Sequence, residues 1–128
     1  MPLSIGIDLI EIARIKESCE RYGEHFFRRI LTDAEVRYCF QKSNPYESIA
    51  VRFAAKEAFA KAVGTGISAK VHWHDVEVER ETSGKPFLKL NREIEGIKPE
   101  QIALSLSHTH EYAVAMVVIA PISNLSNP

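Results

Sequence analysis

The segment from Pro45 to Val63 constrains the fold of this chain most, because its ends and its composition both indicate a long α-helix. Asn44 suits the N-cap, and Glu47 can complete a capping box with it. Pro45 suits the first turn, and Gly64 is placed to end the helix. Alanines along the segment allow other backbone to approach nearly every face. The segment therefore predicts a buried central helix of about five turns.

A carboxylate and an ammonium group share one face of this helix. Glu57 and Lys61 lie four residues apart and in line with Phe53. Lys56 lies beside them, and Arg52 lies about one turn earlier. An exposed ion pair of this spacing would contribute only roughly 0.3–0.5 kcal/mol. The surrounding alanines favour the alternative, in which the pair is desolvated and belongs to a site.

A second acidic residue, Asp8, lies in the apolar segment from Ser4 to Ile12, whose alternation predicts a strand. Aspartate is unfavourable in a strand and needs a partner if it is buried. One interpretation makes Asp8 the N-cap of a helix that begins near Glu11. The other is a metal ion held between Asp8 and Glu57. Hard oxygen ligands without a Cys or His pair at ligand spacing favour magnesium.

Two further segments suit an anion. Gly64 to Gly66 follows the long helix directly, and its glycines can turn backbone N–H groups toward a negative charge. Ile102 to His108 alternates apolar residues with Ser105 and Ser107, which predicts a half-buried strand with small hydroxyl groups on one face and a histidine at its end. The alternatives are a polar outer face and, less favoured without a glycine elbow, a Ser-His dyad.

Taken in order, these segments resemble the bacterial holo-acyl-carrier-protein synthases, the short class of 4′-phosphopantetheinyl transferases. The resemblance rests on Gly6-Ile7-Asp8, Phe53 to Lys61, Gly64-Thr65-Gly66, Ser105 to Thr109 and Tyr112 to Ala115. Thr32 to Glu35 with Tyr38, and Ser83 to Pro86, are similar to intermediate segments of that family. The match covers nearly the whole chain, whereas His72 to His74 and the tail from Ile122 to Pro128 have no functional counterpart that we can assign.

The resemblance implies an α+β fold with an antiparallel sheet packed against a long central helix and shorter helices, in one domain over residues 1–128. It implies transfer of the phosphopantetheine arm of coenzyme A to a serine of apo-acyl carrier protein, for fatty acid biosynthesis, with release of adenosine 3′,5′-bisphosphate. Asp8 and Glu57 would bind magnesium, and Lys61 would add a fixed positive charge. Either Glu57 or a metal-bound water would take the serine proton.

The resemblance also implies a coenzyme A site and a homotrimer with active sites between neighbouring subunits. The residues expected at the coenzyme A site are Arg52, Lys61, Gly64, Thr65, Gly66, Ser83, Gly84, Lys85, Pro86, Ser107, His108 and Thr109. The segment Tyr112 to Ala120 is apolar on both faces, so one face needs cover from a helix or another chain. We expect residues 105–109 to come from a different subunit than Asp8 and Glu57.

The net charge and the distribution of basic residues indicate which partners the chain can bind. The net charge of −1 argues against a general nucleic-acid binder. Arg14 and Arg21 lie seven residues apart on one helical face. Because acyl carrier proteins are strongly acidic, the resemblance implies that this face docks the carrier. The alternative is local pairing of Glu17 with Arg21 and of Glu24 with Arg28.

The remaining features predict a cytoplasmic protein without a membrane partner. The N-terminus lacks the pattern of a signal peptide, and no stretch reaches the roughly 18 apolar residues of a membrane span. Cys19 and Cys39 are expected to be reduced thiols, and His72, His74 and His110 to be structural.

Two other functional classes remain open for this chain: a magnesium-dependent phosphohydrolase and a non-enzymatic trimeric scaffold. Helices are expected at 11–22, 24–31, 33–42 and 45–63, and strands at 4–12, 75–81, 86–90, 102–108 and 112–120.

Overall fold

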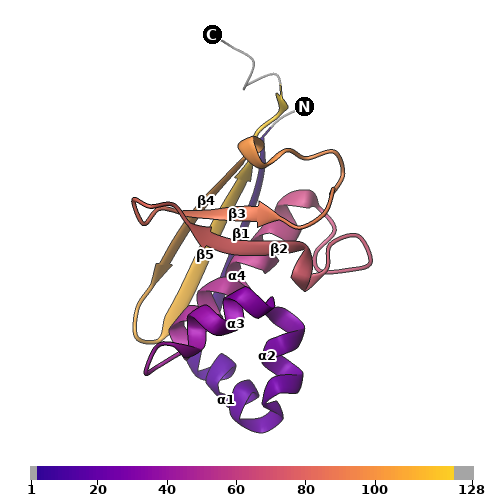
Figure 1. Cartoon of the computed structure of the whole chain (residues 1–128). Coiled ribbons are helices and arrows are strands. Elements are labelled where there is room, and N and C mark those ends of the chain that lie inside the picture. Colours follow the sequence, from indigo (N-terminus) through magenta and orange to yellow (C-terminus); the bar gives the residue numbers. More distant parts are fainter. Residues whose placement is uncertain (1–2, 123–128) are drawn as a thin grey trace.

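The computed structural model describes residues 3–122 as an α+β protein, which confirms the predicted fold class (Figure 1). Most predicted element boundaries lie within about two residues of the observed ones. The tail beyond Ile122 lies outside the described residues. In chain order, the elements are β1 (Ser4–Glu11), α1 (Ile12–Tyr22), α2 (Glu24–Ile30), α3 (Asp33–Phe40), α4 (Tyr46–Val63), η1 (Trp73–Asp75), β2 (Val76–Arg80), β3 (Pro86–Leu90), η2 (Pro99–Gln101), β4 (Ile102–His108) and β5 (Tyr112–Ile119).

Helix α4 begins differently from the prediction. The Asn44 side-chain oxygen accepts a hydrogen bond from the Tyr46 backbone N–H at 3.1 Å, so it does satisfy one amide at the helix start. Glu47 does not complete a capping box with Asn44, because Pro45 is the N-cap and Glu47 is the second residue of the helix. The Glu47 carboxylate lies beside His108. At the other end, Gly64 takes a left-handed conformation (φ 99°), as expected of a residue that ends a helix.

The antiparallel sheet has the strand order β1-β5-β4, and α4 packs along one of its faces (Figure 1). In the register of this sheet, Asp8 and Leu106 both lie opposite Ala115 on β5. Gly6 lies on the face of β1 that is turned toward α4, where it meets the backbone of Ala58. The close approach of β1 and α4 therefore needs a residue without a Cβ atom at position 6.

The other face of this sheet exposes a set of large apolar side chains. Ile5, Ile7 and Leu9 are 61%, 56% and 64% exposed, and Met116 beside them on β5 is 43% exposed. The more polar face of β1, which carries Asp8, is thus the face that packs inward. The alternation of residues 4–12 correctly predicts a strand with Asp8 on its less apolar face. The apolar residues on the other face of β1 do not, however, belong to the core of the single chain.

Helix α4 is buried on most sides, because α1 to α3 cover its first half and the β2–β3 hairpin lies close to it (Figure 1). Lys56 is 0% exposed, and its ammonium group donates hydrogen bonds to Glu35 and to the Ile30 carbonyl oxygen. Glu35 also accepts hydrogen bonds from the backbone N–H groups of Thr32 and Val78. This buried ion pair joins α3, α4 and β2, whereas the sequence suggested only that Lys56 lay beside Glu57.

Candidate active site

Asp8 and Lys61 are brought together by the packing of β1 on α4. The Lys61 ammonium group donates hydrogen bonds to Asp8 Oδ1 and to the Ile7 carbonyl oxygen, each at 3.0 Å. The Asp8 side chain is 15% exposed and that of Lys61 is 50% exposed, so the pair lies at the surface with the carboxylate largely covered. The N-cap interpretation of Asp8 is wrong, because Glu11 precedes α1 and no side chain caps it.

Glu57 lies on the same side of α4 as Lys61. Partial burial raises the pKa of its carboxyl group, the negative charge of Asp8 raises it further, and Lys61 opposes the shift. The influence of Asp8 shows that the two carboxylates are neighbours that repel each other. A divalent cation between them would relieve this repulsion.

The donor set fits magnesium better than a transition metal. Within residues 3–122, no cluster of three or more His, Cys, Asp or Glu side chains is arranged to hold a metal ion. Magnesium commonly uses only one or two protein carboxylates, together with water and phosphate oxygens. Asp8 and Glu57 supply those two carboxylates, and Lys61 leaves the site less negative than a pair of acids alone.

The glycine turn after α4 is not arranged as an anion cradle. The backbone N–H groups of Gly64, Thr65 and Gly66 all donate to the Ala60 carbonyl oxygen, at 3.1, 3.2 and 3.1 Å. These amides therefore cap the helix, and the expectation that they point toward an anion is wrong for this conformation. The same glycine pattern serves both purposes, so the sequence alone could not separate them.

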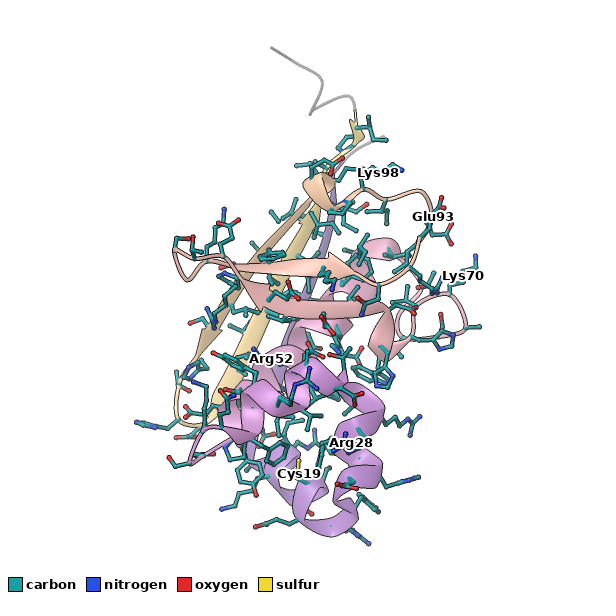
Figure 2. All side chains as sticks on the ribbon, in the orientation of Figure 1. Cys19, Arg28, Arg52, Lys70, Glu93 and Lys98 are labelled. Carbon is teal, nitrogen blue, oxygen red and sulfur yellow. The ribbon has the colours of Figure 1, made fainter. Side chains whose placement is uncertain are left out.

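A second group of predicted residues lines a cavity of about 380 Å³ near the first half of α4. Arg52 is 2% exposed, donates from Nη1 to the Ser48 carbonyl oxygen, and packs its guanidinium group 4.4 Å from the centre of the Tyr38 ring. Its buried Nε has no hydrogen-bond partner within residues 3–122. Figure 2 shows Arg52 between the helical part and the β2–β3 hairpin. The positive charge of this guanidinium group beside the cavity suits an anionic ligand.

Two further cations, Lys42 and Arg80, line this cavity and were missed by the sequence analysis. The Lys42 ammonium group lies 5.1 Å from the centre of the Tyr38 ring. Burial alone would raise the pKa of Tyr38, but a hydrogen bond from Arg80 and the charges of Lys42 and Arg52 outweigh it, so that the pKa is lowered. No local pattern marks Lys42 or Arg80, because Lys42 lies in the turn after α3 and Arg80 ends β2, whereas Arg52 lies on α4.

The remaining residues expected at the site occupy turns or strand ends. Arg80 donates to the Gly84 carbonyl oxygen at 2.9 Å, which holds the turn from Ser83 to Lys85, and Pro86 borders the cavity. Thr109 accepts hydrogen bonds from the N–H groups of Glu111 and Tyr112, so its hydroxyl closes the β4–β5 hairpin. Ser105 and Ser107 lie on the exposed outer face of the sheet.

The structure does not bring all these residues into one site. Asp8 lies on β1 and His108 lies on β4, which are opposite edges of the sheet with β5 between them. Strands two positions apart are separated by roughly 10 Å. Within one chain, the carboxylate site and the basic cavity therefore form two separate parts.

On α1, Arg14 and Arg21 are exposed, and within the described residues no ion pair joins Arg21 to Glu17. Glu24 and Arg28 do form the expected pair, at 3.6 Å. The local pairing alternative is therefore correct for α2 only.

The histidines and cysteines that the sequence left without a function have structural surroundings. His74 Nε2 lies 2.7 Å from the Arg28 carbonyl oxygen, and the His72 backbone N–H donates to Asp75 at 2.7 Å. Burial raises the pKa of the Cys19 and Cys39 thiols to about 11, with a further contribution to Cys19 from Glu20, which favours the unreactive thiol form. None of the helices in residues 3–122 is long and apolar enough to cross a membrane.

Comparison with known proteins identifies the family. The sequence model of the 4′-phosphopantetheinyl transferase superfamily matches residues 4–117. The holo-[acyl-carrier-protein] synthase of Chloroherpeton thalassium is 56% identical over 119 residues, which are 93% of this chain and 98% of that protein. The chain therefore belongs to the 4′-phosphopantetheinyl transferase superfamily. It is an enzyme of the holo-[acyl-carrier-protein] synthase type, as the resemblance implied.

Solved structures agree with this assignment over nearly the full length. The holo-[acyl-carrier-protein] synthase of Neisseria meningitidis has a TM-score of 0.84 at 35% identity and covers 92% of this chain and 98% of that chain. The corresponding protein of Bacillus anthracis, solved in complex with CoA (3′,5′-ADP), has a TM-score of 0.77 at 42% identity, with 91% and 94% covered. These likenesses confirm the predicted fold.

Proposed function

We propose that this enzyme transfers the 4′-phosphopantetheine group of coenzyme A to a serine hydroxyl of an apo-acyl carrier protein, with magnesium, and releases adenosine 3′,5′-bisphosphate. The observation that carries the proposal is the convergence of Asp8, Glu57 and Lys61 where β1 packs on α4. The Bacillus anthracis relative, in complex with CoA (3′,5′-ADP), supports coenzyme A as the donor. The proposed acceptors are cytoplasmic carrier proteins of fatty acid biosynthesis.

Phosphoryl transfer depends mainly on positioning and on neutralising charge at the phosphate oxygens. Asp8 and Glu57 would hold the magnesium ion, which when bound supplies positive charge to the pyrophosphate. Lys61 provides a cation that is fixed from two sides, by Asp8 and by the Ile7 carbonyl oxygen. The three side chains therefore place both signs of charge where a transferring phosphoryl group requires them.

The basic cavity would bind the nucleotide end of coenzyme A, with the 3′-phosphate near Arg52, Lys42, Arg80 and His108. The cationic side chains that line this cavity support this role, because guanidinium and ammonium groups bind phosphate oxygens through charge-assisted hydrogen bonds. The turn from Ser83 to Pro86 would border the nucleotide. We propose further contacts to coenzyme A from the turn Gly64 to Gly66, whose glycines leave room for the ligand. Ser107 and Thr109 would contact it through their hydroxyl groups.

We also propose a homotrimer in which one subunit's carboxylate site is completed by the basic cavity of its neighbour. Two observations support this assembly. The carboxylates and the cavity lie at opposite edges of the β1-β5-β4 sheet, and the outer face of that sheet exposes Ile5, Ile7, Leu9 and Met116. Covering such a face with other copies of the chain would bury apolar surface, which stabilises association. Arg14 and Arg21 on α1 would dock the acidic carrier.

The test is to incubate the protein with coenzyme A, magnesium and apo-acyl carrier protein, and to weigh the carrier by mass spectrometry. We expect the carrier to gain one phosphopantetheine group on serine, and the gain to disappear when a chelator removes magnesium. Release of the nucleotide without a change in carrier mass would instead indicate a phosphohydrolase. An unchanged carrier with intact coenzyme A would favour the scaffold alternative.

A further inference from the structure

His108 and Glu47 form a polar contact that neither the fold nor the proposed chemistry explains. His108 ends β4, and Glu47 lies in the first turn of α4. The distance from His108 Nδ1 to Glu47 Oε2 is 3.1 Å, and both side chains are partly exposed. Glu47 therefore has a partner from another element in place of the capping box that the sequence predicted.

The contact fixes which nitrogen of His108 is available to a ligand. Nδ1 faces two acceptors, the Glu47 carboxylate and the Thr109 carbonyl oxygen, the latter at 3.4 Å. An imidazole nitrogen between two acceptors carries the proton. Nε2 is then the nitrogen left to interact with other groups. Thr109 belongs to the same hairpin as His108, whereas Glu47 lies on α4. The contact with Glu47 therefore orients the His108 ring relative to the helix.

Glu47 carries a negative charge in a cavity whose other charged side chains are cationic. The titratable side chains that line the same cavity are Tyr38, Lys42, Arg52, Arg80, His108 and Glu47, and among these described residues Glu47 is the only carboxylate. A negative charge beside a phosphate site weakens phosphate binding by repulsion. The presence of Glu47 at this cavity therefore suggests that it has another task. Orienting the His108 ring through a hydrogen bond to Nδ1 is such a task.

We propose that Glu47 is a positioning residue of the coenzyme A site, which holds His108 so that its Nε2 is presented to the 3′-phosphate. This inference rests on the proposed function, in which the cavity binds the nucleotide end of coenzyme A. Glu47 acts on the ligand only through His108.

The test measures the Kd of coenzyme A and of dephospho-coenzyme A, which lacks the 3′-phosphate, by calorimetry on the intact protein. We expect Glu47→Ala to weaken coenzyme A binding about three- to tenfold, the effect of losing one hydrogen bond, and to leave dephospho-coenzyme A binding nearly unchanged. Glu47→Gln should restore most of the affinity, because its amide oxygen can accept the same hydrogen bond. In a His108→Ala background, Glu47→Ala should have no further effect.

Glu24→Ala is the matched control, because Glu24 also lies in the first turn of a helix and contacts a cation, Arg28, and neither of these residues lines this cavity. The inference is overturned if Glu47→Ala binds coenzyme A as well as or better than the wild type, if both ligands weaken equally, or if the loss persists without His108. If His108→Ala leaves coenzyme A binding unchanged, or weakens both ligands equally, the proposed phosphate site at His108 is refuted, and the inference with it.

Discussion

A Cβ atom on Gly6 would lie 1.8 Å from the carbonyl oxygen of Ala58, so these two residues set how closely β1 approaches α4. No side chain fits between the two backbones at this point. Asp8 lies two residues further along the same face of β1 and therefore comes alongside Lys61 one turn later on the helix. The glycine thus determines the distance between the carboxylate on the strand and the charged residues on the helix.

Gly6→Ala should destabilise the protein by about 1–3 kcal/mol, as overpacking of a close contact does, and should lower transferase activity by at least about tenfold. The added methyl group must push β1 away from α4, and Asp8 moves with the strand. Thermal unfolding and the carrier-mass assay would measure the two effects. A variant with wild-type stability and activity would show that the contact at Ala58 relaxes without moving Asp8.

Asp8→Asn and Glu57→Gln should each reduce transferase activity by at least about 100-fold while the fold stays intact, because each removes a hard anionic ligand from the proposed magnesium site. Circular dichroism and size-exclusion chromatography would check that folding and assembly are unchanged. Near-normal turnover of either variant at limiting magnesium would mean that its carboxylate is not a ligand.

Mixing inactive Asp8→Asn subunits with inactive His108→Ala subunits should restore part of the activity. The two residues lie at opposite edges of the sheet in one chain, so a shared site would take one residue from each neighbour. A mixed assembly then contains a site with neither substitution. If labelled subunits exchange and activity does not return, either both residues serve the same site within one chain or His108 is dispensable.

Local sequence signals predicted the elements well because their causes are local. Gly64 ended α4 as expected, since a left-handed residue at a helix end depends on its own backbone. The alternation of β4 likewise placed Ser105 and Ser107 on the exposed face. A metal ion between Asp8 and Glu57 was one of two open interpretations of Asp8, and only the family resemblance favoured it, because no local rule joins a strand to a helix so far along the chain.

The interactions that the sequence missed all join distant segments. Lys56 was expected only to lie beside Glu57 on the helix, but it is buried and paired with Glu35, 21 residues earlier. Glu47 has a good local role in a capping box, yet the fold places His108 within its reach. In both cases the competing partner comes from another element, so neither propensity nor spacing could reveal it.

Asp75 should make the stability of the protein depend on pH in the acid range. Burial alone would raise the pKa of Asp75, but hydrogen bonds from the Arg92 guanidinium group and the His72 backbone N–H outweigh it, so that the pKa in the folded state is lowered. A carboxyl group with a lowered pKa stabilises the fold above its unfolded value near 3.9, and this contribution is lost as the pH falls through the folded value.

Asp75→Asn should therefore lower the free energy of unfolding by roughly 1–2 kcal/mol at neutral pH, and the difference from the wild type should shrink below about pH 4. Urea unfolding at several pH values would measure both curves. A difference that stays constant down to pH 2 would show that the carboxylate charge is not what stabilises the loop before β2.

The double variant Arg14→Glu with Arg21→Glu should raise the KM for the carrier protein strongly and leave the affinity for coenzyme A almost unchanged. Both arginines are exposed on α1, away from the residues that line the basic cavity. Charges at the rim of an interface act mainly on the association rate and its salt dependence. The wild-type KM for the carrier should therefore rise with ionic strength, and that of the double variant should rise less, because its attraction is already gone.

Arg37→Glu, a charge reversal at an exposed position on α3, is the matched control and should have a much smaller effect. An unchanged carrier KM in the double variant would mean that the carrier docks on another surface.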